Sequence, residues 1–178
     1  MTNLKNTKTE KNLQKALEGE ALAHLKYQFY KSQLSNYSKE YEQILDEIIH
    51  NEKEHGKIWF KQLNDGEVPS DVENLLDAYL GEKYEHLEMY PQYSRVAEEE
   101  GFYEISKLFY QIAKIEGYHM QEFEQMKKSI ETEKGFKSND EEVTWKCLNC
   151  GYQYIGKEAL SECPVCKHPR KHFTKKEI

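Results

Sequence analysis

The sequence predicts a mainly α-helical protein in which a four-helix bundle is joined to a small metal-stabilised module. Three observations support this prediction. Four stretches carry apolar residues at alternating steps of three and four, as helices with one buried face do. Each of the four stretches also places a glutamate among its apolar positions. All four cysteines lie near the C-terminus, as two CxxC pairs.

The composition is that of a soluble, helix-rich protein. Of the 178 residues, 32% are charged and 38% are hydrophobic, and the length suits one medium domain plus a small module. The net charge of -7 argues against nucleic acid or an acidic membrane surface as the main partner. No apolar run approaches the roughly 20 residues of a membrane span, and the N-terminus has no apolar signal region. We therefore expect a cytoplasmic protein that binds neither nucleic acid nor membrane.

The first two helices each begin a pattern of steps of four and three. The first is expected to start at a capping box formed by Thr7 and Glu10. Its buried face carries Leu13, Leu17, Glu20, His24 and Tyr27. The second helix is expected to end near Asn64, and its buried face carries Leu45, Ile48, Glu52, His55 and Trp59.

The third and fourth helices repeat the pattern. A second capping box, Ser70 with Glu73, starts the third helix, which Pro91 is expected to kink and Gly101 to end. Its buried face carries Leu75, Tyr79, Glu82, His86 and Met89. The fourth helix has the longest unbroken pattern: Ile105, Phe109, Ile112, Glu116, His119, Phe123, Met126 and Ile130. We assign residues 1–134 to the bundle, 135–144 to a polar linker and 145–178 to the cysteine module.

The stretch EIIHNEKEH, Glu47 to His55, contains two overlapping Glu-x-x-His pairs. Glu52 and His55 are in phase with the apolar residues of their helix and are expected to point into the bundle. His50 is turned by roughly 200° from Ile48, onto the opposite face. We therefore interpret Glu47 and His50 as a chance match on a solvated face.

Five glutamates and two histidines are expected to meet inside the bundle. They are Glu20, Glu52, Glu82, Glu85, Glu116, His55 and His119. A lone glutamate on a buried face is more often a boundary residue that reaches solvent, but here every helix contributes one. Burying a carboxylate without a partner costs several kcal/mol. Two divalent cations would nearly neutralise the group, so the sequence predicts a dinuclear metal site.

Four further residues lie close to this predicted site. For His24 and His86, a hydrogen-bonded place in the core is a better interpretation than metal binding. Tyr27 and Tyr90 could donate hydrogen bonds to the carboxylates, although their spacing fits ordinary core tyrosines equally well.

The cysteines follow the pattern Cys147-x2-Cys150-x12-Cys163-x2-Cys166. This spacing predicts a tetrahedral site with four thiolate ligands. In a chain without an export signal, such pairs indicate a metal rather than disulfides. The spacing alone leaves structural zinc and redox iron open. The apolar side chains expected to cover the metal are Trp145, Tyr152, Tyr154, Ile155 and Phe173.

Several stretches together form a specific pattern: LKNTKTEKNLQKALEGE, NEKEH, GEKYEHLEMYP, AEEEGFYEI, IAKIEGYH, and CxxCGY with CPVCKHP. In these stretches the chain resembles the rubrerythrin family. The resemblance implies a ferritin-like di-iron bundle followed by a rubredoxin-like domain with one iron bound by four cysteines. It also implies a peroxidase in oxidative-stress defence, which reduces hydrogen peroxide to water. Electrons would come from a reduced pyridine nucleotide through a partner reductase.

The resemblance also implies roles for individual residues. Glu52 and Glu116 would bridge the two irons. Glu20 would bind one iron only, whereas Glu82 and His119 would bind the other.

Two residues would exchange as ligands when the first iron changes its oxidation state, namely Glu85 and His55. Tyr27 and Tyr90 match tyrosines that lie next to the ligands in the family. The chain departs from the family at residues 21–24, where Ala-Leu-Ala-His replaces the usual polar and basic residues.

The connection between the second and third helices is short for this fold. The resemblance makes these helices parallel, so the connection must cross the length of the bundle. The third helix would be roughly 45 Å long, but the seven residues 64–70 span at most about 25 Å. We therefore expect a domain-swapped homodimer. At each of the two sites, one chain would give Glu20, Glu52 and His55, and the other chain would give the remaining four ligands.

Two other functions fit parts of the pattern. A ferritin-like iron oxidase and storage protein would use the bundle, but it would not need the fused cysteine module. A dimanganese catalase with a structural zinc module would disproportionate peroxide without outside electrons. The metals bound at the two sites distinguish these alternatives from the peroxidase.

Overall fold

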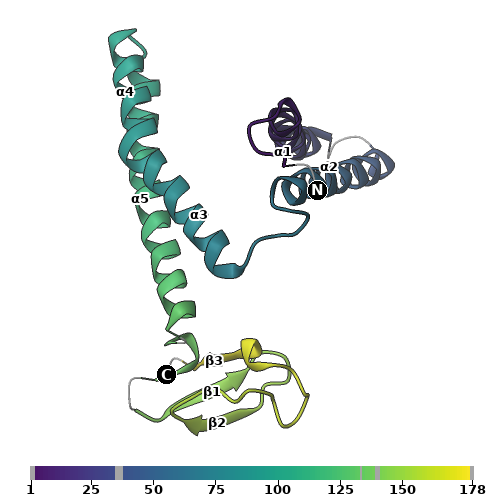
Figure 1. Ribbon diagram of the computed structural model, residues 1–178, viewed down its shortest axis with the longest axis vertical. Coiled ribbons are helices and arrows are strands. Elements are labelled where there is room, and N and C mark those ends of the chain that lie inside the picture. The colour runs from purple at the N-terminus through teal and green to yellow at the C-terminus, as the bar shows by residue number, and fades with distance from the viewer. Residues whose placement is uncertain (1–2, 35–37, 133, 139–140, 177–178) are drawn as a thin grey trace. The chain divides into compact units, whose positions relative to one another are not determined.

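The computed structural model describes residues 3–34, 38–132, 134–138 and 141–176. Its helices are α1 (Lys8–Leu34), α2 (Lys39–Leu63), α3 (Asp71–Tyr84), α4 (Tyr90–Glu99) and α5 (Tyr103–Glu131), and the π-helical turn η1 (Glu85–Met89) joins α3 to α4. The strands are β1 (Val143–Cys147), β2 (Gln153–Gly156) and β3 (Phe173–Lys175). The mainly helical architecture is as predicted (Figure 1). The contacts divide the chain into two compact units, Met1–Pro69 and Ser70–Ile178.

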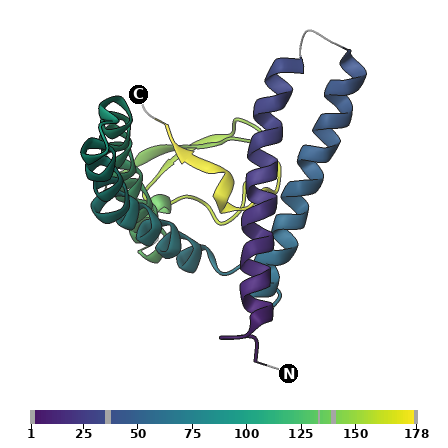
Figure 2. The same cartoon turned by 90° about the horizontal axis from the view of Figure 1, so that it is seen from above.

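The first unit is a hairpin of α1 and α2, which lie side by side (Figure 2). The predicted start of α1 is confirmed, because the Thr7 hydroxyl accepts a hydrogen bond of 3.0 Å from the amide of Glu10. The side chain of Glu10 accepts from the amide of Asn6 at 2.6 Å. Gly56 faces α1, where a Cβ atom would make ordinary van der Waals contact with Leu17 and Glu20 at 3.7 Å.

In the second unit, the α3–η1–α4 helix packs along α5. The predicted capping box is confirmed: Ser70 accepts from the amide of Glu73, whose carboxylate accepts from the amide of Ser70 at 2.9 Å. Gly101, with φ of 85°, follows the end of α4 as predicted.

The disturbance expected at Pro91 takes the form of a π turn. The amide of Tyr90 bonds to the carbonyl of Glu85, five residues earlier, instead of four. Pro91 has no amide hydrogen, and its ring would collide with the carbonyl of Leu87 in a regular α-helix. The wider π turn just before the proline relieves this conflict.

Apolar residues expected to be buried remain exposed within each hairpin. Ile48 and Ile105 are exposed, whereas their neighbours Ile49 and Ser106 are buried. None of the residues of α1, all of which are described, is buried. A helix in a four-helix bundle has two neighbours, so contact with one helix covers only part of its apolar face. In the described residues, no helix is long and apolar enough to cross a membrane.

The C-terminal module is a three-stranded antiparallel sheet in the order β2-β1-β3. Its core consists of Trp145, Cys147, Ala159, Cys163 and Phe173. Tyr152 and Tyr154 pack against this core as expected, but Ile155 is 67% exposed and does not cover the cysteines.

The segment expected as a linker also contributes to the module. Phe136 packs against the core of the module, and β1 already begins at Val143. Residues 139 and 140 of this segment lie outside the described residues. The assignment of residues 1–134, 135–144 and 145–178 to a bundle, a linker and a module stays a prediction.

Candidate metal centres

The first hairpin brings three predicted ligands together. Ligand atoms of Glu20, Glu52 and His55 all lie within 4.8 Å of one another. The Nδ1 atom of His55 is 3.1 Å from a carboxylate oxygen of Glu52. The indole of Trp59 donates a hydrogen bond of 3.4 Å to Glu20. We call this group the first half-site.

The second hairpin contains a matching group, which we call the second half-site. Ligand atoms of Glu82, Glu116 and His119 also lie within 4.8 Å of one another. The Nδ1 atom of His119 is 2.7 Å from Glu116 and 3.6 Å from Glu82. Glu116 is only 14% exposed, whereas His119 is 47% exposed. The carboxylate is therefore held against the hairpin, and the imidazole remains free to turn toward a metal.

The two half-sites differ at one position. Glu85 follows Glu82 by three residues, and the equivalent residue after Glu20 is Ala23. The second hairpin therefore offers one carboxylate more than the first. Glu85 does not belong to the group within 4.8 Å, but its charge reaches the neighbouring side chains, as their pKa values show.

The π turn brings the two tyrosines into equivalent places. Tyr27 lies seven residues after Glu20, whereas Tyr90 lies eight residues after Glu82. The extra residue falls within η1, where the wider turn accommodates it. Both tyrosines therefore follow their glutamate by two helical turns.

The second half-site is strongly negative. Burial raises the pKa of Glu82, and a hydrogen bond with Glu116 and the charges of Glu116 and Glu85 raise it further, while His119 partly opposes the shift. Burial also raises the pKa of Tyr90, together with the charges of the same three carboxylates. A bound cation would remove this repulsion, which is the fit expected of a metal site.

The remaining bundle residues fall as the sequence predicts. Glu47 and His50 are exposed on α2, outside the first half-site. His24 and His86 are hydrogen-bonded within their hairpins, through Nδ1, to the carbonyls of Ile49 at 2.9 Å and Ala113 at 2.5 Å. Sequence reasoning could not identify these acceptors, because a backbone carbonyl has no signature in the sequence.

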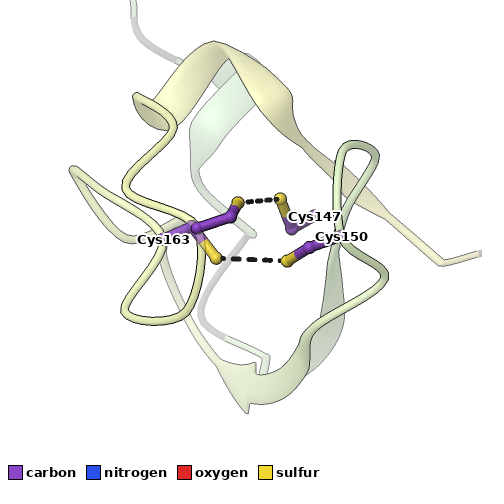
Figure 3. A group of neighbouring side chains, drawn as sticks. Cys147, Cys150 and Cys163 are labelled. Carbon is purple, nitrogen blue, oxygen red and sulfur yellow. Dashed lines mark hydrogen bonds between the residues drawn. The ribbon is translucent and has the colours of Figure 1, made fainter.

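The four cysteines converge in the C-terminal module, and Figure 3 shows three of them, Cys147, Cys150 and Cys163, with their side chains directed toward one another. Their sulfur atoms all lie within 4.8 Å of one another, with 3.7 Å between Cys147 and Cys166 and 3.6 Å between Cys150 and Cys163. A tetrahedral metal with bonds of about 2.3 Å to sulfur separates its ligands by about 3.8 Å, whereas a disulfide needs about 2.05 Å. The arrangement therefore fits one metal ion held by four thiolates.

Each CxxC pair forms a tight turn that directs backbone amides toward the cysteines. Gly151 and Lys167, which follow the two pairs, have φ values of 78° and 60°. Their amides bond to the carbonyls of Cys147 and Cys163 at 2.8 and 3.0 Å. The residue type of Gly151 indicates this conformation in the sequence. Lys167 gives no such indication, because residues other than glycine rarely adopt a positive φ.

The thiols differ in how readily they ionise. A hydrogen bond from the backbone of His168 lowers the pKa of Cys166 to about 6. The backbone of Tyr152 acts in the same direction on Cys150, but burial and the other three cysteines raise the pKa of that thiol to about 12. A metal ion must therefore displace protons from this group in order to bind.

Comparison with known proteins identifies the family. Residues 11–127 match the family model described as Rubrerythrin, and residues 145–174 match the rubredoxin-like domain of rubrerythrin. The chain belongs to the rubrerythrin family. It is 40% identical to the rubrerythrin of Clostridium perfringens (strain 13 / Type A), over 97% of this chain and 96% of that protein. It is 34% identical to the rubrerythrin of Nitratidesulfovibrio vulgaris, with the same coverage of 97% and 96%.

Membership of the rubrerythrin family confirms the resemblance seen in the sequence. The fold is a ferritin-like helical bundle with a small rubredoxin-like region. The cofactors of the rubrerythrin family are a di-iron centre and one iron bound by four cysteines, and the half-sites and the cysteine group suit them. The chain is thus a di-iron oxidoreductase of oxidative-stress defence.

Proposed function

We propose that this chain is a non-haem di-iron peroxidase that reduces hydrogen peroxide to water. Electrons would come from a reduced pyridine nucleotide through a partner reductase and the iron of the cysteine module. The observation that carries the proposal is that one chain combines two carboxylate–histidine half-sites with a four-cysteine site. When bound, two irons in the bundle would supply the two electrons that break the O–O bond, and an iron held by the four cysteines would replace these electrons one at a time.

The ligand roles follow the family pattern. In our proposal, Glu52 and Glu116 would bind both irons, the role that the family resemblance gives them, and each lies beside a histidine on the second helix of its hairpin. Glu20 would bind one iron, whereas Glu82 and His119 would bind the other. Glu85 and His55 would be alternative ligands of the first iron. His55 is 52% exposed, so its ring has room to turn away from Glu52.

Reduction of one peroxide molecule to two water molecules consumes two electrons and two protons. The side chains of the second half-site can hold such protons close to the reacting oxygens. Burial and the neighbouring carboxylates raise the pKa of Glu82, so in the metal-free protein this carboxyl keeps its proton to higher pH than an ordinary glutamate. Tyr90 keeps its phenolic hydrogen, because burial and the surrounding carboxylates raise its pKa. Tyr27 takes the equivalent place in the first hairpin.

Electrons enter the cysteine module from one side. Cys147 and Cys163 are buried, whereas Cys150 is exposed. A partner protein therefore approaches the iron most closely over Cys150. The four free thiolates also need a reducing compartment, which supports a cytoplasmic location.

We also propose that the active form is a domain-swapped homodimer. The connection between α2 and α3 consists of residues 64–70, which reach at most about 25 Å. The helix from α3 through α4 runs from Asp71 to Glu99, about 43 Å at ~1.5 Å per residue. In a ferritin-like bundle the connection must cover this distance. The hairpin of one chain would instead complete the half-site of its partner.

The exposed side chains of both hairpins support this dimer. Phe29 of α1 is 60% exposed and Leu108 of α5 is 57% exposed. Further large apolar residues are exposed on the helices of both units: Leu22, Leu25, Ile44, Ile58, Leu76, Leu80 and Tyr118. Apolar helix faces of this extent are normally buried against other apolar helices, and a hairpin of the partner chain would bury them.

Titration of the reduced protein with peroxide, without oxygen, tests the function. The peroxidase predicts that one peroxide is consumed for every two electrons and that no oxygen is released. Oxygen release without electron consumption would show a catalase, and growth of an iron mineral on addition of ferrous iron would show a storage protein. Glu52→Ala should abolish the reaction. Glu47→Ala, an exposed glutamate on the same helix, should leave it unchanged.

A further inference from the structure

His24 and His86 make the same contact in the two hairpins. His24 lies four residues after Glu20, and its Nδ1 atom is 2.9 Å from the carbonyl oxygen of Ile49. Ile49 lies three residues before Glu52. His24 of α1 is therefore hydrogen-bonded to α2 one turn before Glu52.

The second hairpin repeats this arrangement. His86 lies four residues after Glu82, and its Nδ1 atom is 2.5 Å from the carbonyl oxygen of Ala113. Ala113 lies three residues before Glu116. Two helix pairs with different sequences thus use the same side chain, the same ring nitrogen and the same position relative to their glutamates.

The acceptors show which nitrogen of each ring carries a hydrogen. A carbonyl oxygen only accepts hydrogen bonds, so Nδ1 must carry the hydrogen in His24 and in His86. The Nε2 atom of a neutral ring is then an acceptor. For His24 this agrees with the side-chain amide of Gln28, which lies 3.2 Å from Nε2 and can donate to it.

The ring of His86 depends on a glycine next to the ligands. A Cβ atom on Gly117 would lie 2.9 Å from Cε1, 3.0 Å from Nδ1 and 3.1 Å from Nε2 of His86. The edge of the ring that carries both nitrogens therefore lies against Gly117, the residue after Glu116. A methyl group there would push the ring away from the carbonyl of Ala113.

We propose that His24 and His86 are matched positioning residues that fix the register of the two helices in each half-site. The carboxylates of a half-site repel one another before a metal binds, because Glu82 and Glu116 lie side by side with His119 between them. A hydrogen bond one turn away opposes this repulsion. Each hairpin thereby holds its glutamates close together before the metal arrives.

Substitution of the two histidines tests this role. His→Asn retains an N–H donor at nearly the position of Nδ1, whereas His→Leu removes it at similar size. In protein whose bundle has been stripped of metal, His24→Leu and His86→Leu should bind Mn²⁺ about tenfold more weakly, and the Asn variants should recover most of the affinity. Circular dichroism verifies that each variant is folded. Equal affinity of the Leu variants and the parent protein would overturn the proposal, as would Asn variants no better than Leu.

A second pair of variants tests the contact without metal. Gly117→Ala should remove the signal of Nδ1–H of His86 from ¹⁵N–¹H spectra of the stripped protein. Gly81→Ala is the matched control, because Gly81 precedes Glu82 and a Cβ atom added there would meet nothing within 4 Å. Retention of the signal in Gly117→Ala would overturn the contact. The Mn²⁺ measurement rests on the proposed ligands, whereas the spectra do not, so the two can fail separately.

Discussion

The Nδ1 atom of His119 lies 2.7 Å from a carboxylate oxygen of Glu116, one turn earlier on α5. Two groups proposed to bind the same metal are therefore partners of each other when no metal is present. Metal binding must break this contact and displace the proton between them. The charge state of the second half-site thus controls both the stability of the metal-free protein and its readiness to bind metal.

The stability of the metal-free protein should depend on Glu82 in a defined direction. The pKa of Glu82 is raised above its ordinary value of 4.5, so the folded state binds the proton more tightly than the unfolded state. The unfolding free energy therefore falls as the pH rises from 4.5 through the raised pKa. Glu82→Gln should remove this loss and raise the melting temperature at neutral pH.

Glu73, on the same helix, is the control for this measurement. Hydrogen bonds from Ser70 lower the pKa of Glu73 below 4.5, so its contribution is present above that value and is lost as the pH falls through the lowered pKa. Glu73→Gln should therefore weaken the protein near neutral pH. If both variants shift the melting curves in the same direction, the assigned charges are wrong.

Metal analysis should find three irons per chain, two in the bundle and one in the cysteine module. The reason is the ligand set of five glutamates, two histidines and four cysteines. Elemental analysis and the visible spectrum of the full chain measure this directly. Zinc at the cysteines, with a colourless module, would contradict the proposed electron path.

Cys147→Ser should abolish peroxide reduction driven by the reductase. The bundle should still react, because its ligands lie in other segments of the chain. After chemical reduction, we expect the variant to consume one equivalent of peroxide per di-iron site. Normal turnover with the reductase would show that electrons enter elsewhere.

Glu85→Ala should affect oxidised iron more than reduced iron. Ferric iron is a harder ion and favours carboxylate over imidazole, so loss of the exchange partner of His55 should destabilise the oxidised form. Glu88→Ala, three residues later in the same π turn and exposed, is the control. An unchanged spectrum of oxidised Glu85→Ala, with unchanged turnover, would argue against ligand exchange.

Mixing two inactive variants tests the domain swap. In a swapped heterodimer of Glu52→Ala and Glu116→Ala chains, one site carries both defects and the other is intact. Activity should therefore reappear, up to about half of the parent activity per heterodimer, after the chains are unfolded together and refolded. In an unswapped dimer every site keeps one defect, and activity would stay absent.

Helical phase was sufficient to predict which side chains each hairpin brings together. The steps of three and four separated Glu52 and His55 from the neighbouring pair Glu47 and His50, and the structure brings the predicted ligands of each hairpin together. Helical phase could not show which neighbouring helix packs on each face of a helix. Ile48 was therefore expected to be buried, but it is exposed in its hairpin. The meeting of the two half-sites stays a prediction.

Other features depend on interactions that the sequence does not encode locally. The π turn arises because Pro91 conflicts with a carbonyl four residues earlier. The spacing of apolar residues along the helix does not reveal the one extra residue that this turn contains. The contacts of His24 and His86 end on backbone atoms. The φ value of Lys167 is imposed by the turn of its cysteine pair, whereas the equivalent Gly151 could be recognised from its residue type.

The π turn also has a consequence for changes in chain length. In a regular α-helix, deletion of one residue rotates everything beyond it by about 100° and moves buried side chains to the surface. Within η1, the same deletion would convert the π turn into an α-helical turn, and α4 would keep its helical phase, but Pro91 would again meet a carbonyl four residues earlier. The segment Glu85–Met89 is therefore a place where one residue can be lost without rotating α4, at the expense of this conflict at the proline. What such a deletion would change is the spacing between Glu82 and Tyr90, which would become the spacing between Glu20 and Tyr27.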